Sequence, residues 1–158
     1  MLVNVSASLY TQAIIEAERR YVAPEVQIEF WCRLGKAVLD NPEADAALIA
    51  DLVALQVATS SNQNPPLKSA AHNKNILESG SFIQTLATLP ANTRDTVNQT
   101  LHALIDNDTI AQRLQGDLNE FCLYQWGEAS QLFQVAYKRH NQSDVLWALS
   151  LARKYVGM

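Results

Sequence analysis

The segment from Pro24 to Leu39 constrains the fold more than any other part of this 158-residue chain. It has the length and spacing of a helix, with Pro24 in the first turn and Asp40-Asn41-Pro42 at its end. A helix with apolar groups around most of its surface must bury more than one face, and Gly35 admits close approach of another backbone. One strand and two helices cannot supply those partners alone, so we expect a second chain to do so. The apolar positions are Val26, Ile28, Phe30, Trp31, Leu34, Gly35 and Val38.

The residues before this helix predict a short strand and another helix. Residues 2–6 alternate in character, with Val3 and Val5 facing one way, which is typical of a strand. Apolar residues then recur at helical spacing up to Tyr21.

The rest of the chain predicts an α+β fold. A third helix is expected over residues 43–58, followed by a polar linker over 59–66 that ends in two prolines. Three strands near the C-terminus should form an antiparallel meander. The elements expected after the linker are a strand at 76–78, a helix that stops before Pro90, a helix over 90–105, and strands at 118–126, 131–139 and 144–153.

Composition limits the classes of function. Twelve Lys and Arg residues stand against sixteen Asp and Glu, which argues against strong non-specific binding to nucleic acid. We expect no signal peptide, and no run of about 18 apolar residues could span a membrane. Cys32 and Cys122 lie in apolar stretches, as is typical of reduced, buried thiols. The sequence therefore predicts a soluble, cytoplasmic protein that does not engage a membrane.

The chain lacks the short motifs that hold cofactors. Its three histidines, His72, His102 and His140, are far apart and have no paired cysteines beside them. Phosphate-binding and nucleophile motifs such as GxGxxG and GxSxG are also missing. We therefore expect neither a metal nor a cofactor.

The first forty residues resemble the ParD-like antitoxin family. The similarity lies in Val5-Ser6, Leu9-Tyr10 and the run from Gln27 to Ala37, with its Gln-Ile-Glu, Trp, Arg and Gly-Lys-Ala elements. A strand followed by two helices, the second apolar almost all round, is also similar to the ribbon-helix-helix fold. In that fold two chains pair their strands and share one core.

This resemblance implies a ribbon-helix-helix segment over residues 1–42 that dimerises and binds operator DNA. The implied dimer interface comprises Val3, Val5, Ile28, Trp31, Leu34 and Gly35. The ribbon would read base edges in the major groove, and the second helix would point its N-terminal N–H groups at a phosphate. The implied DNA-binding residues are Leu2, Asn4, Ser6 and Ala23. The chain departs from the family in lacking an Arg near Asn4 and a Ser near Ala23.

Residues 76–158 resemble the RelE/ParE toxin superfamily. The strand-helix-helix-meander order is shared, and the similar stretches are Leu114 to Leu118, Phe133 to Tyr137 and Ala152 to Tyr155. RelE-like members cleave mRNA on the ribosome, whereas ParE-like members inhibit gyrase. The resemblance implies Arg153, Tyr155 and Lys138 as catalytic residues. Gln134 stands where RelE-like members usually carry Arg, so we expect impaired or absent nuclease activity.

Three hypotheses follow. The first is a type II toxin–antitoxin fusion in which residues 43–75, a helix plus linker, cover an inactive or masked toxin-like domain at 76–158. The second is an active mRNA interferase with an N-terminal dimerisation arm. The third is a non-enzymatic regulator whose C-terminal domain binds a partner protein. The implied partners are a second copy of the chain, operator DNA, and a toxin, the ribosome or gyrase.

Overall fold

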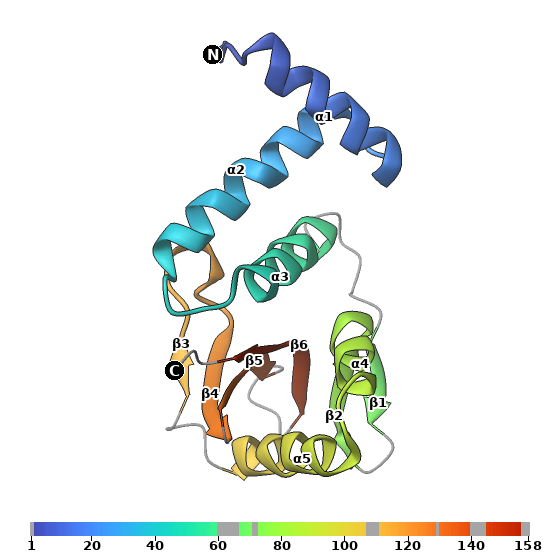
Figure 1. Cartoon of the computed structure of the whole chain (residues 1–158), viewed down its shortest axis with the longest axis vertical. Coiled ribbons are helices and arrows are strands. Elements are labelled where there is room, and N and C mark those ends of the chain that lie inside the picture. Colours follow the sequence, from blue (N-terminus) through green and yellow to red (C-terminus); the bar gives the residue numbers. More distant parts are fainter. Residues whose placement is uncertain are drawn as a thin grey trace.

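A six-stranded sheet with helices on both faces forms the body of the molecule in the computed structural model (Figure 1). The structure describes residues 2–59, 67–70, 73–106, 111–128, 130–139 and 145–155. The helices are α1 (Ala7–Arg20), α2 (Pro24–Asp40), α3 (Ala46–Thr59), α4 (Gly80–Ala87), α5 (Ala91–Asp106) and the short 3-10 helix η2 (Gly116–Leu118). The strands are β1 (Leu67–Ala70), β2 (Asn73–Ser79), β3 (Gln112–Arg113), β4 (Cys122–Glu128), β5 (Gln131–Arg139) and β6 (Leu146–Tyr155). The expected α+β class is confirmed.

The strands are arranged in the order β1-β2-β6-β5-β4-β3. The predicted antiparallel meander is confirmed, because β5 pairs with both β4 and β6 in antiparallel register. Strand β2 pairs with β6 in parallel, with Ile76 opposite Leu146, so the middle of the chain joins its C-terminal part in one sheet. The short strand predicted at 76–78 is longer in the structure, where β2 covers Asn73–Ser79, and it pairs with strand β1, which was not predicted.

Two hydrophobic clusters lie on opposite faces of this sheet. The first contains Leu48, Ile49, Leu52 and Val53 of α3, packed on sheet residues such as Leu149. The second contains side chains of α4 and α5, packed on the odd-numbered residues of β5: Phe133, Val135 and Tyr137. Because successive side chains of a strand point to opposite faces, the sheet is a wall between two separate cores.

Helix α3 is apolar on nearly every side because it is covered from two directions. Its sequence carries a single charged residue, Asp51. The sheet covers one side of the helix, and partly buried residues of α2, namely Phe30, Leu34 and Val38, pack against the same cluster. Figure 1 shows α3 between α2 and the sheet, with α5 on the opposite side of the sheet. The helix predicted over 43–58 is thus confirmed, but it is part of the core of the sheet domain rather than of a connecting segment.

Helices α1 and α2 form a hairpin that extends from the body (Figure 1). Helix α1 buries only its small residues Ala13 and Ala17, and it ends at Tyr21, which adopts the left-handed conformation with φ 57°. The strand expected at residues 2–6 is not a strand in the single chain. These residues are irregular, because a strand needs a paired neighbour, and Ser6 instead caps α1 by accepting a hydrogen bond from the Leu9 N–H at 3.2 Å.

Two other expectations need correction or lie outside the described residues. The strand expected at 118–126 begins only at Cys122, because Gly116–Leu118 form a 3-10 helix whose first residue has φ +69°. The polar linker at 59–66 overlaps the last residue of α3, Thr59, and its remainder lies outside the described residues.

Candidate functional site

The best-defined candidate site is the contact between the beginning of α3 and the middle of the sheet. Gln134 of β5 is fully buried there, and both ends of its side-chain amide are bonded. The amide nitrogen donates to the Glu43 carbonyl at 2.8 Å and to Oε1 of Gln125 at 3.0 Å. The amide oxygen accepts from the Asp45 N–H at 2.8 Å. A buried amide of this kind is stable because its donors and its acceptor oxygen all have partners.

Asp45, the residue just before α3, contributes to the same contact between α3 and the sheet. Its Oδ1 accepts from the Ala47 N–H at 2.9 Å, which caps the helix, and its Oδ2 lies 3.8 Å from Nζ of Lys154 on β6. Lys154 is one of the basic residues of the C-terminal stretch that resembles the toxin tail. The first turn of α3 therefore engages a lysine as well as the buried amide of Gln134.

A second polar connection lies further along α3, at Asp51. Its Oδ2 accepts hydrogen bonds from Ser81 Oγ of α4 at 2.6 Å and from Ser150 Oγ of β6 at 2.7 Å. Ser150 is fully buried. Sequence reasoning did not single out Asp51, although a lone carboxylate in an otherwise apolar helix signals a specific partner.

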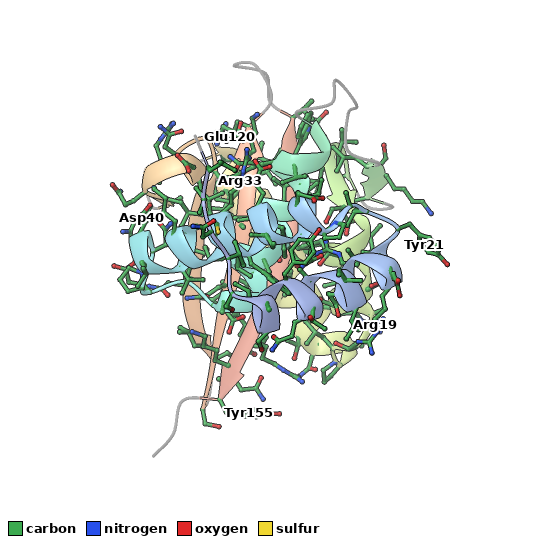
Figure 2. All side chains as sticks on the ribbon, turned by 90° about the horizontal axis from the view of Figure 1, so that it is seen from above. Arg19, Tyr21, Arg33, Asp40, Glu120 and Tyr155 are labelled. Atoms are coloured by element: carbon green, nitrogen blue, oxygen red, sulfur yellow. The ribbon has the colours of Figure 1, made fainter. Side chains whose placement is uncertain are left out.

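The residues implied as catalytic do not meet at one place. Arg153 lies opposite Phe133 in the β5–β6 ladder, and its guanidinium lies 5.7 Å from the ring centre of Tyr155, which is 70 % exposed. Lys138 lies opposite Trp147 and pairs with Glu120 at 3.1 Å. Since Phe133 belongs to one core cluster and Trp147 packs against the other, Lys138 projects from the opposite face of the sheet. Figure 2 shows Glu120 and Tyr155 on opposite sides of the molecule.

The residues implied in DNA binding lie at two places on the hairpin, before α1 and at the turn between α1 and α2. Leu2 and Val3 are 97 % and 71 % exposed, and Asn4 is exposed beside them. Ser6 caps α1, and Ala23 is the N-cap residue of α2 without a side-chain hydrogen bond. The structure thus keeps Leu2, Asn4 and Ser6 within one short exposed segment, and Ala23 at the turn between the helices.

The residues implied in dimerisation divide between two environments. Ile28, Trp31 and Gly35 recur on one side of α2, where Gly35 is exposed and no atom lies within 4 Å of the position of a Cβ. Leu34 instead packs on the first core cluster of its own chain. Val3 and Val5 are exposed, together with apolar residues of α1 such as Leu9, Ile14 and Ile15. An exposed apolar surface of this kind marks an interaction site.

A surface hollow of about 700 Å³ lies where α2 and α3 meet the segment around η2. Its lining includes Arg33, Gln56 and Glu120, and Figure 2 shows Arg33 next to Glu120. Gln56 bridges α3 to this segment by donating to the Asp117 carbonyl at 2.7 Å and to Glu120 at 3.1 Å. The adjoining rim carries the ion pair of Lys36 with Asp40, and hydrogen bonding to that carboxylate raises the pKa of Lys36.

Asn41 is a second structural residue that sequence reasoning read only as a helix end. It is buried where α2 ends, and its side chain bonds the backbone of Gln115 twice. Its Oδ1 accepts from the Gln115 N–H at 2.7 Å, and its Nδ2 donates to the Gln115 carbonyl at 3.2 Å. These bonds fix the end of α2 to the segment before η2.

In the described parts of the chain, the placement of metal-ligating side chains and the apolarity of the helices bear on two further kinds of function. In these parts no three His, Cys, Asp or Glu residues are placed to hold a metal ion. Nor does any of the described helices have the length and apolarity needed to cross a bilayer.

These surfaces define an α+β protein with a protruding helical hairpin, whose exposed apolar residues suit association with another macromolecule. The chain belongs to the ParD-like antitoxin family of type II bacterial toxin–antitoxin systems, because the family model matches residues 1–86 of the 158. The match runs from α1 through β2 into α4, and it leaves the resemblance of the C-terminal part to RelE/ParE toxins without support from a family. No curated protein and no solved structure matches the chain.

Proposed function

We propose that the chain is a dimeric, DNA-binding regulator of a type II toxin–antitoxin system that carries its own toxin-like domain in a covered form. The hairpin of α1 and α2 dimerises, and residues 2–6 of two chains pair into a ribbon that reads operator DNA. Helix α3 occupies the face of the sheet on which the toxin-like domain would act, and so keeps that domain inactive.

The observation that carries this proposal is the position of Gln134 beneath α3. RelE-like toxins usually have an arginine at this position. Here the neutral side chain of Gln134 forms hydrogen bonds with the backbone of residues 43 and 45. The basic residue Lys154, on the same side of the sheet, lies against Asp45 of the helix cap. Family membership of residues 1–86 supports the antitoxin role, and ParD-like antitoxins typically dimerise and bind a toxin.

The DNA-binding part is tested by gel mobility shift with the DNA upstream of the chain's own gene. We expect Asn4→Ala to weaken specific binding, because one good bidentate contact to a base contributes about 1–3 kcal/mol of discrimination. Gln12→Ala, an exposed change on α1, is the matched control. Equal affinity of both variants and the wild type would remove Asn4 from the recognition surface, and no specific binding by the wild type would leave a dimerisation module only.

The second candidate is a non-enzymatic regulator whose C-terminal domain binds a partner protein. It is favoured by the separation of Lys138 from Arg153 and Tyr155 on opposite faces of the sheet. An active interferase needs its acid, base and cations at one phosphate. If purified full-length protein cleaves ribosome-bound mRNA and Arg153→Ala abolishes the cleavage, the interferase hypothesis replaces both candidates.

A further inference from the structure

The Gln134 amide recognises a short stretch of backbone and no side chain of α3. It donates to the carbonyl of residue 43 and accepts from the N–H of residue 45, so the two bonds flank the chain just before the helix begins. Gln125 on the neighbouring strand β4 fixes which end of the amide is the donor, since its Oε1 accepts at 3.0 Å. This arrangement holds the entry of α3 in one position relative to the sheet.

The apolar contacts of α3 are distinct from those of α5, although Asp51 of α3 also accepts a hydrogen bond from Ser81 of α4. Ile49 and Leu52 of α3 belong to the first hydrophobic cluster, whereas Val97 and Leu101 of α5 belong to the second cluster across the sheet. Local opening of a protein proceeds in contiguous cooperative units. The α3 side can therefore open while the α5 side stays packed.

We propose, building on the covered domain proposed above, that Gln134 is a latch that holds α3 on the sheet and thereby controls exposure of the covered face. Gln134 is a positioning residue in this role, and it acts through the backbone of residues 43–45. When the latch is broken, residues 43–45 and the beginning of α3 move away from β5 and β6, and the ion pair of Asp45 with Lys154 of β6 breaks.

The test compares the full-length wild type with Gln134→Met, which keeps the volume of the side chain and removes its hydrogen bonds. We expect hydrogen exchange at the backbone amides of Ile49, Leu52 and Val53 to accelerate by about tenfold or more, which is the scale of losing buried hydrogen bonds. The amides of Val97 and Leu101 should keep their wild-type rates. Gln131→Met, on the same strand but the other face, is the matched control and should change neither group.

A second variant, Gln134→Glu, distinguishes a latch from simple loss of packing. When protonated, the glutamic acid can still donate to the Glu43 carbonyl and accept from the Asp45 N–H, and it loses only the second donor toward Gln125, so α3 should be better protected than in Gln134→Met measured at the same acidic pH. When ionised, it cannot donate to the Glu43 carbonyl, so protection of α3 should fall as the pH rises. The difference between the methionine variant and the wild type should persist across the same pH range.

Unchanged exchange of α3 in Gln134→Met would overturn the latch, and so would an equal acceleration of α3 and α5. Growth of cells that express the same full-length variants separates this result from the proposed function. Local opening of α3 with growth arrest supports both. Local opening with normal growth supports Gln134 as the residue that holds α3 on the sheet, and it overturns the idea that α3 restrains a toxic domain.

Discussion

Replacing Asn41 by alanine tests the joint between the helical hairpin and the sheet domain. The side chain is 2 % exposed, and it makes two hydrogen bonds to the backbone of Gln115 besides one to the Ala37 carbonyl at 3.0 Å. The Ala37 carbonyl keeps a partner after the change, because it also accepts from the Asn41 N–H. The Gln115 N–H loses its bond at 2.7 Å and the Gln115 carbonyl loses a weaker one.

The size of the effect follows from these losses. An unsatisfied buried donor or acceptor costs about 1–3 kcal/mol. Gln115 is exposed and both of its bonds to Asn41 are partly buried, so water can offset part of the cost at each group. We expect Asn41→Ala to lower the free energy of unfolding by about 2–3 kcal/mol, which for a chain of this length corresponds to a fall in Tm of roughly 4–12 °C.

Urea titration followed by circular dichroism measures this difference at one fixed protein concentration, since association would shift the apparent stability. Asn119→Ala, an exposed change just after η2, should stay within about 0.5 kcal/mol of the wild type. A loss below about 0.5 kcal/mol for Asn41→Ala would show that water replaces the side chain at no cost. The joint would then not depend on Asn41.

Three other changes probe separate features. Ile49→Ala removes a fully buried side chain from the first core cluster, and calorimetry should show a loss of about 2–5 kcal/mol; a loss under about 1 kcal/mol would contradict the burial of α3. Gly116→Ala introduces a Cβ at φ +69° and against the Asp40 carboxylate, so chemical denaturation should show a loss of about 1–3 kcal/mol, whereas wild-type stability would show that the turn tolerates other conformations. Burial raises the pKa of Glu78 above 4.5, so the folded protein binds more protons than the unfolded chain, and stability should fall as the pH rises from 4.5 through the raised pKa. The variant Glu78→Gln should remove this fall and be at least as stable as the wild type at neutral pH. An unchanged pH profile of stability in this variant would assign the fall to other groups.

The helices were predictable because their apolar spacing is a local property. The apolar spacing predicted a helix from about Pro24 to Leu39, and the structure has α2 at Pro24–Asp40. Strand β5 matches the alternation of Phe133, Val135 and Tyr137 against polar and small neighbours. Local patterns therefore defined these elements without knowledge of their partners.

The partners themselves depended on contacts far apart in the chain. The apolar surplus of α2 was assigned to a second chain, but part of it, including Leu34, packs on the chain's own core through α3. The role of Gln134 depends on residues 43–45, which lie about ninety positions earlier. No local pattern reports such a contact. The strand expected at residues 2–6 is irregular for a related reason, because no described strand of the chain pairs with these residues.

The two sides of the contact between α3 and the sheet are synthesised at different times. The Asp45 N–H is made 89 residues before the Gln134 side chain that it bonds, and bacterial-type synthesis at about 5–20 residues per second separates them by roughly 4–18 s. During that interval the nascent chain presents the apolar surface of α3 before the strand that it covers exists. The α3 segment is therefore always synthesised before the last strands emerge, and the sheet domain is never completed ahead of the segment that covers it.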